Sequence, residues 1–126
     1  MTLQPTRTAM LSVDHEKVRA LLDALKGGAD INTASQFAGL NYATVYRWVE
    51  RGQRENERIE EGLPADPSEA EFLELWQAMR KARAEAVVRN VAQVQKAAAQ
   101  GEWRAAAWWL ERSVSDFRKP STRESE

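Results

Sequence analysis

Hydrophobic residues recur along this chain at intervals of three and four, the spacing that places them on one face of an α-helix. Residues 14–26 show this most simply, since their apolar positions are Val18, Leu21, Leu22 and Leu25. The Gly27-Gly28 pair then ends the segment. A second, shorter helix is predicted over residues 33–38, and a third from Tyr42 towards Ile59. The first half of the chain is therefore predicted to form three consecutive helices.

The junction between the second and third predicted helices has the composition of a helix-turn-helix. Gly39 lacks a Cβ and so tolerates the left-handed conformation that commonly ends a helix. Asn41, directly before Tyr42, has a side chain suited to capping the next helix. Leu40, Val45 and Trp48 fall on one face, which we expect to be buried. Because such a unit places its second helix in the major groove, the segment predicts DNA binding.

The opposite face of the third helix mixes aromatic, small, polar and basic side chains, which suit base edges and phosphates. The residues expected to contact DNA are Asn41, Tyr42, Ala43, Thr44, Tyr46, Arg47, Arg51 and Arg54. The chain has a net charge of −1, so one copy could neutralise only a few phosphates and its binding should be weak and salt-sensitive. Useful binding would then need several linked copies, which points towards an oligomer.

The second half of the chain begins at residues 61–67, where glycine and prolines predict a linker. Ser68, with Glu71 three residues later, is expected to form a capping box for the next helix. Residues 69–100 contain neither Gly nor Pro, which favours one long helix. Gly101 is expected to end it, and residues 102–114 to form a shorter helix that folds back as an antiparallel hairpin.

This predicted hairpin is poorly supplied with its own core, because the long helix is about three times the length of its partner. Trp108 and Trp109 are adjacent and point about 100° apart around a helix, so at least one should be exposed. Exposed aromatics of this size mark interfaces. We expect copies of the chain to meet at the following residues: Phe72, Trp76, Met79, Val87, Val91, Val94, Trp103, Trp108, Trp109 and Leu110.

The fold predicted from these patterns is all-α, with an N-terminal tri-helical unit followed by a helical hairpin. The expected divisions are a flexible N-terminus (1–12), a helix-turn-helix DNA-binding domain (13–60), a linker (61–67), a hairpin oligomerisation domain (68–114) and a disordered C-terminal tail (115–126). Residues 60–74 hold six acids and no base, which we interpret as a solvated linker and helix start.

Composition removes several classes of function. The 126 residues include no cysteine and a single histidine, His15, so disulfides, thiolate metal sites and most acid–base triads are unavailable. No apolar run reaches the roughly 20 residues that a membrane span needs, and the N-terminus lacks a signal-peptide core. We therefore expect a protein that is not an enzyme, holds no metal or cofactor, and does not associate with a membrane.

The order of these parts resembles the small terminase subunits of tailed bacteriophages and prophages. The resemblance spans residues 30–112 and comprises a generic helix-turn-helix, INTASQFAGLNYATVYRWVERG, and a more specific closing segment, GEWRAAAWWLER. It implies a protein of the host bacterial cytoplasm that recognises viral double-stranded DNA for packaging. It also implies a homo-oligomeric ring built through the hairpin, and recruitment and regulation of the large terminase subunit, which carries the ATPase and nuclease, through the C-terminal tail.

Two other interpretations remain open at this level. One is a dimeric helix-turn-helix transcriptional regulator or excision-type factor, which would bind half-sites about one DNA turn apart. The other is a helical adaptor whose tri-helical unit binds protein, in which case the chain would not bind DNA even at low salt.

Overall fold

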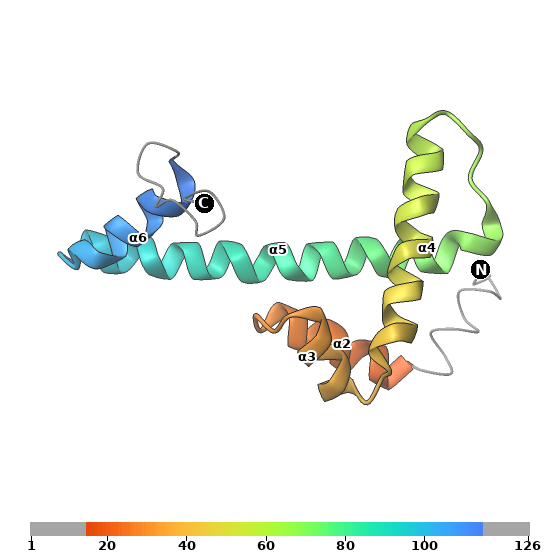
Figure 1. The fold of residues 1–126 in the computed structure, drawn as a ribbon, viewed down its shortest axis with the longest axis horizontal. Coiled ribbons are helices and arrows are strands. Elements are labelled where there is room, and N and C mark those ends of the chain that lie inside the picture. The colour runs from red at the N-terminus through yellow and green to blue at the C-terminus, as the bar shows by residue number, and fades with distance from the viewer. Residues whose placement is uncertain (1–14, 115–126) are drawn as a thin grey trace, which may run out of the picture. The chain divides into compact units, whose positions relative to one another are not determined.

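The protein is described by a computed structural model that covers residues 15–114. Over this range it is all-helical, with 83% of residues in helices and no strand, as predicted. The helices are α2 (His15–Lys26), α3 (Ile31–Ala38), α4 (Tyr42–Glu60), α5 (Ala70–Ala99) and α6 (Trp103–Ser113), with a 3₁₀ turn η1 (Pro67–Glu69) before α5 (Figure 1). The expected N-terminal segment 1–12 and C-terminal tail 115–126 lie outside the described residues.

The described residues divide into two compact units, residues 15–86 (unit 1) and residues 87–114 (unit 2). The division falls inside α5, whereas the sequence pattern predicted a boundary at residues 61–67. The reason is that the first half of α5 shares a core with the helices before it. The long helix is therefore not a separate domain from the tri-helical segment, and residues 70–86 belong to unit 1.

The core of unit 1 takes side chains from four helices. Val45 of α4 and Leu21 of α2 are completely buried, and the residues around them are Val18, Leu25, Ala34, Ala38, Phe72, Leu75, Met79 and Ala82. Leu40 and Trp48 are partly buried against this cluster, so the predicted inner face of α4 is confirmed. Burial of apolar area at about 25 cal/mol per Å² makes this cluster the main source of stability for unit 1.

Gly52 marks the point where α4 crosses the first half of α5 (Figure 1). It is buried, and a Cβ at this position would overlap the carbonyl oxygen of Phe72 and lie 2.5 Å from Cβ of Trp76. The two backbones thus approach so closely that only a glycine fits. A glycine inside a helix costs about 1 kcal/mol relative to alanine, and the packing role of Gly52 explains its place in α4.

The segment between α4 and η1 is fastened to α4 by a buried carboxylate. Glu55, 2% exposed, accepts a hydrogen bond from the backbone N–H of Asp66 at 2.7 Å and another from Arg58 at 2.5 Å. A buried carboxylate is tolerated only when it is paired and hydrogen-bonded in this way. The expected linker is therefore an ordered connection within unit 1.

The start of the helix after this connection differs from the predicted capping box. Asp66 is the N-terminal cap of η1, and its carboxylate accepts hydrogen bonds from the backbone N–H of Ser68 at 3.0 Å and the Ser68 hydroxyl at 2.8 Å. The prediction that Ser68 is the cap was wrong, because Pro67 takes the first helical position and Asp66 precedes it. The capping hydrogen bonds hold the pKa of Asp66 below its usual value.

Unit 2 contains the end of α5 and all of α6. Gly101 has a left-handed φ of 98°, and the Glu102 side chain caps α6 by accepting a hydrogen bond from the backbone N–H of Arg104 at 3.2 Å. The two helices line a shared groove, with Val94 and Ala98 on α5 and Ala106, Trp109 and Leu110 on α6. Between residues 87 and 114, however, no residue is buried. Within a single chain this unit has a contact between helices but no core.

Candidate nucleic-acid interface

The turn between α3 and α4 follows the local signals in the sequence closely. Asp30 caps α3 by accepting a hydrogen bond from the Thr33 N–H at 2.8 Å, and hydrogen bonding to the side chain and the N–H of Thr33 lowers the pKa of Asp30. Gly39 ends the helix with a φ of 76°, and the Leu40 N–H donates to the carbonyl of Ser35 at 2.9 Å. This pairing is the usual way in which a left-handed glycine satisfies the last carbonyls of a helix.

Asn41 caps α4 as predicted. Its side-chain oxygen accepts hydrogen bonds from the N–H groups of Ala43 at 2.9 Å and Thr44 at 3.3 Å. Only three residues, Gly39, Leu40 and Asn41, therefore separate α3 from α4. Because both ends of the turn are held by capping hydrogen bonds, the first turns of α4 have a fixed position relative to α3.

The outer face of α4 carries most of the predicted DNA-contacting side chains. Tyr42 and Tyr46 are exposed, with ring centroids 6.0 Å apart. Thr44 is half-buried at the edge of this face and accepts a hydrogen bond from Arg47 at 3.3 Å. The residues that α4 presents together are Asn41, Tyr42, Ala43, Tyr46, Arg47 and Arg54, all of them exposed; we call these the α4 outer face.

Arg51, also predicted to contact DNA, is exposed one turn after Arg47, but its guanidinium is bound within the chain. Its Nε donates to Glu69 at 3.0 Å and its Nη2 at 2.5 Å, and the guanidinium lies 3.9 Å from the centre of the Phe72 ring. The hydrogen bonds to Glu69 raise the pKa of Arg51. A bidentate pair stacked on an aromatic ring fixes the guanidinium, so Arg51 joins α4 to the start of α5.

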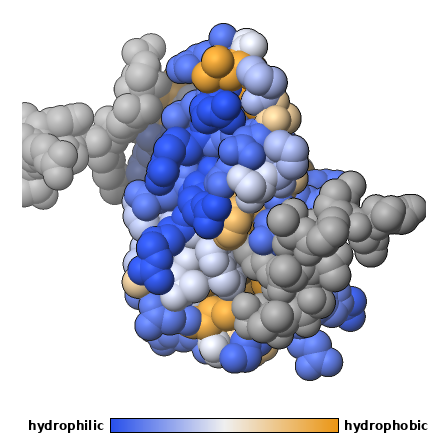
Figure 2. Space-filling view, turned by 90° about the vertical axis from the view of Figure 1, so that its right-hand side faces the viewer, coloured by the Kyte–Doolittle hydropathy of each residue, from blue (hydrophilic) through white to orange (hydrophobic). Residues whose placement is uncertain are grey.

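An exposed aromatic side chain on α3, Phe37, was not singled out from the sequence. It lies two residues before Gly39 and is 72% exposed. Ala34 and Ala38 form the buried side of α3, and that spacing was the signal that Phe37 points outwards. Glu50 lies between Arg47 and Arg54 on α4, and Glu57 follows Arg54. Both glutamates are exposed, so the charge of the α4 outer face is nearly balanced. In the view of Figure 2, where α4 and the segment after it face the viewer, the surface is mostly hydrophilic with isolated apolar side chains.

The predicted interface residues divide between the two units. Phe72 and Met79 are buried in the core of unit 1, and Trp76 is half-buried there with Arg80 lying over its ring at 4.8 Å. All three positions pack against helices of the same chain, whereas the sequence pattern had assigned them to contacts between copies. The reason is that α2, α3 and α4 pack on the first half of α5.

The remaining members lie in unit 2 and keep accessible surface. Trp103, Trp108 and Val87 are exposed, and Val91, Val94, Trp109 and Leu110 are half-buried. The expectation that adjacent tryptophans cannot both be buried is confirmed, since Trp108 is 44% exposed. Arg112 lies 4.3 Å from the centre of the Trp108 ring.

The described residues offer little other chemistry. Among residues 15–114 there is no group of three or more His, Cys, Asp or Glu side chains that could hold a metal ion. In the same range no helix has the length and apolar character to cross a membrane. Comparisons of the chain with protein-family models, curated proteins and solved structures found no match.

Proposed function

We propose that this chain is a non-catalytic protein that binds double-stranded DNA through α4 and acts in several linked copies. The observation that carries the proposal is the α3–Gly39–α4 geometry, with Asn41 as cap and the α4 outer face exposed. A helix held in this way and free along one side fits the major groove, which is about 12 Å wide. The turn and helices are then interpreted as a helix-turn-helix.

The positions along α4 suggest a division of roles in this proposal. Tyr42, Ala43 and Tyr46 lie in the first two turns, the part of a recognition helix that contacts base edges. Arg47 and Arg54 are exposed on the same face and suit phosphate oxygens. Arg51 takes no part, because its guanidinium is bound to Glu69.

The charge of the α4 outer face supports weak binding by a single copy. Glu50 and Glu57 offset Arg47 and Arg54, so few phosphates are neutralised and little counterion is released. Linking several copies multiplies such weak contacts through effective concentration. Unit 2 suits this linking role, because none of its described residues is buried within one chain and several apolar side chains remain accessible.

The closing segment GEWRAAAWWLER extends the proposal to a biological role. Its resemblance to small terminase subunits supports a ring-forming protein that recognises viral DNA for packaging in the host bacterial cytoplasm. Such a protein recruits and regulates the large subunit that carries the ATPase and nuclease.

A second candidate is a helical adaptor that binds protein through the same surface. Phe37 is the observation that favours it, because a phenylalanine that is 72% exposed two residues before the turn is typical of protein interfaces. The nearly balanced charge of the α4 outer face fits this candidate as well. A dimeric regulator would share the DNA-binding surface and differ in copy number.

The test is a titration of labelled duplex DNA over a series of salt concentrations. The Arg47→Ala, Arg54→Ala double variant should bind more weakly, and the slope of log K against log salt should fall by about one to two units. Lys81→Ala with Lys96→Ala is the matched control, because it removes the same charge from exposed positions of α5. If wild type does not bind at low salt, or if the double variant behaves as wild type, α4 is not the DNA-binding surface.

A further inference from the structure

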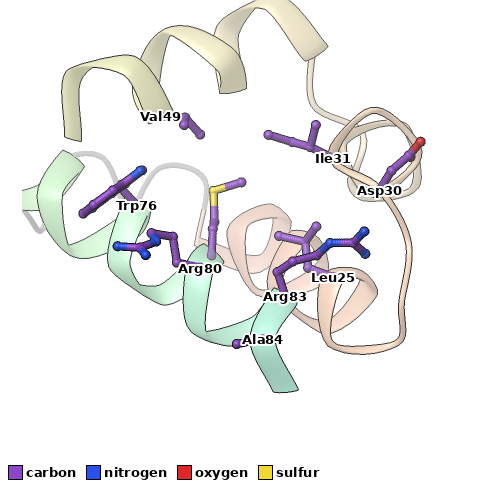
Figure 3. A pocket seen from close by; sticks show the side chains of 9 residues that line it. Leu25, Asp30, Ile31, Val49, Trp76, Arg80, Arg83 and Ala84 are labelled. Carbon is purple, nitrogen blue, oxygen red and sulfur yellow. The ribbon is translucent and has the colours of Figure 1, made fainter. Parts of the chain in front are cut away.

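Unit 1 contains an apolar groove of 550 Å³ between α4 and α5 that is unrelated to the α4 outer face (Figure 3). Leu25, Ile31, Val49 and Met79 form its walls, one from each of the four helices. Trp76 and Ala84 extend it along α5. A groove of this size and composition accommodates one or two apolar side chains.

The rim of the groove is predominantly basic. Arg80 and Arg83 stand on α5 beside it, as Figure 3 shows, and Arg83 donates to the carbonyl of Gly28 at 3.4 Å. Asp30 also lies there, but its carboxylate accepts the hydrogen bond that caps α3. An apolar side chain with carboxylates next to it is therefore the complementary ligand.

The same unit carries a surface of that kind at the end of α4. Of the six acids in residues 60–74, Asp66 caps η1, Glu69 binds Arg51, Glu71 is buried and Glu74 is half-buried on α5. Glu60 and Glu61 remain exposed beside two exposed apolar side chains, Ile59 and Leu63, and Leu63 is 46% exposed. We call residues 59–63 the acidic corner. Hydrogen bonds from the N–H of Leu63 to the carbonyl of Arg58 (3.1 Å) and from Arg58 to the carbonyl of Pro64 (3.5 Å) hold it in place.

No residue of the acidic corner lines the groove of its own chain, although Glu60 shares a second, polar groove with Arg80. Val49 lines the groove and Glu60 ends α4, and the helix separates them by about 16 Å at 1.5 Å per residue. The segment that follows is fixed by Glu55. A contact between the two surfaces must therefore join different molecules.

We propose that the acidic corner of one copy docks in the apolar groove of a second copy, with Leu63 inserted and Glu61 facing Arg83. The two surfaces are different, so the contact is head-to-tail and each copy has both halves of it. This inference rests on the proposed action in several copies and adds a contact within unit 1 to the association through unit 2. It would fix the distance between neighbouring α4 helices along DNA.

Cysteine cross-linking tests the contact directly, since the full chain contains no cysteine of its own. Leu63→Cys protein is mixed under mild oxidation, without DNA, with a differently tagged Ala84→Cys protein. Disulfides need Cα atoms within about 7 Å, so the mixed species should form at least tenfold faster than with a Glu85→Cys partner. Glu85 is the matched control because it is exposed, neighbours Ala84 and does not line the groove. Equal rates with both partners would overturn the proposal.

Charge reversal provides a second readout on the same full-length proteins. Arg83→Glu in the Ala84→Cys partner should slow the mixed cross-link several-fold, and Glu61→Lys in the Leu63→Cys partner should restore it. Arg83 is chosen because Arg80 also faces Glu57 and Glu60 of its own chain in a second, polar groove. A cross-link that is indifferent to both reversals would contradict the contact. If the cross-link fails to form while the protein still binds DNA, only this inference is rejected. If the protein does not bind DNA, the proposed function fails, and the cross-link still reports whether the two surfaces meet.

Discussion

At the scale of single residues, Gly52 shows how one position determines a helix crossing. Two effects of Gly52→Ala oppose each other. Alanine favours a helix interior by about 1 kcal/mol over glycine. The added Cβ would meet the backbone of Phe72 and Cβ of Trp76, and neither moves without shifting α5. Overpacking of this kind costs about 1–3 kcal/mol, so the steric term should exceed the propensity term.

We predict that Gly52→Ala lowers the free energy of unfolding by about 1 kcal/mol, the difference between an overpacking cost of about 2 kcal/mol and a propensity gain of about 1 kcal/mol. Urea denaturation followed by circular dichroism measures it. Gly27→Ala is the control, because its Cβ would come no closer than 3.4 Å to the Ala24 carbonyl oxygen. That control should stay within about 0.5 kcal/mol of wild type. A stabilised Gly52→Ala protein would show that α4 and α5 are further apart.

Asp66 gives the fold a defined pH dependence. The hydrogen bonds from Ser68 hold its folded-state pKa below its unfolded value of about 3.9. The ionised carboxylate therefore stabilises the folded chain above that pH, and the contribution is lost as pH falls through the lower folded-state pKa.

Asp66→Asn keeps a hydrogen-bond acceptor at the cap and removes the charge. Its urea midpoint should lie below that of wild type at pH 7, and the two midpoints should converge as pH falls below about 4. A difference that persists unchanged at low pH would mean that geometry at the cap, not the ionised carboxylate, accounts for the effect.

At the scale of helices, the sequence signals that act locally were reliable. Glycines, caps and apolar spacing predicted five helices, and Gly39 and Asn41 have the predicted capping roles. The start of α3 was predicted two residues late, because Asp30 was not recognised as its cap. These signals suffice because a helix end depends on residues within about one turn of it.

Contacts between helices were harder to predict from the sequence. The spacing of Phe72 and Met79 identified an apolar face of α5 but not the helices that cover it. Arg51 and Glu69 are 18 residues apart, and nothing in either segment indicates their pairing. The candidate site was affected in the same way. Helical spacing predicted the exposure of the five members of the α4 outer face that lie within α4, which are Tyr42, Ala43, Tyr46, Arg47 and Arg54. The pairing of Arg51 with Glu69 depends on the fold and could not be predicted in this way.

At the scale of the whole chain, the two units differ in how they bury apolar surface. Unit 1 has a core drawn from four helices. The described part of unit 2 has no buried residue, although it includes Trp103, Trp108 and Trp109. Burial of apolar surface stabilises a protein by about 25 cal/mol per Å². The helices of unit 2 would therefore become more stable if copies of the chain covered their accessible apolar side chains. Under the proposed function, that gain would join several weak contacts of α4 with DNA into one multivalent assembly.

The molar mass of the protein in solution, measured by light scattering at micromolar concentration without DNA, tests this association most directly. We predict a mass of more than two copies of the 14.3 kDa chain. The Trp108→Ala, Trp109→Ala double variant should have a clearly lower mass. Phe37→Ala, which removes an exposed aromatic side chain from unit 1, should leave the mass unchanged. A wild-type protein that is a stable monomer, or strictly a dimer, would contradict the assembly proposed for unit 2.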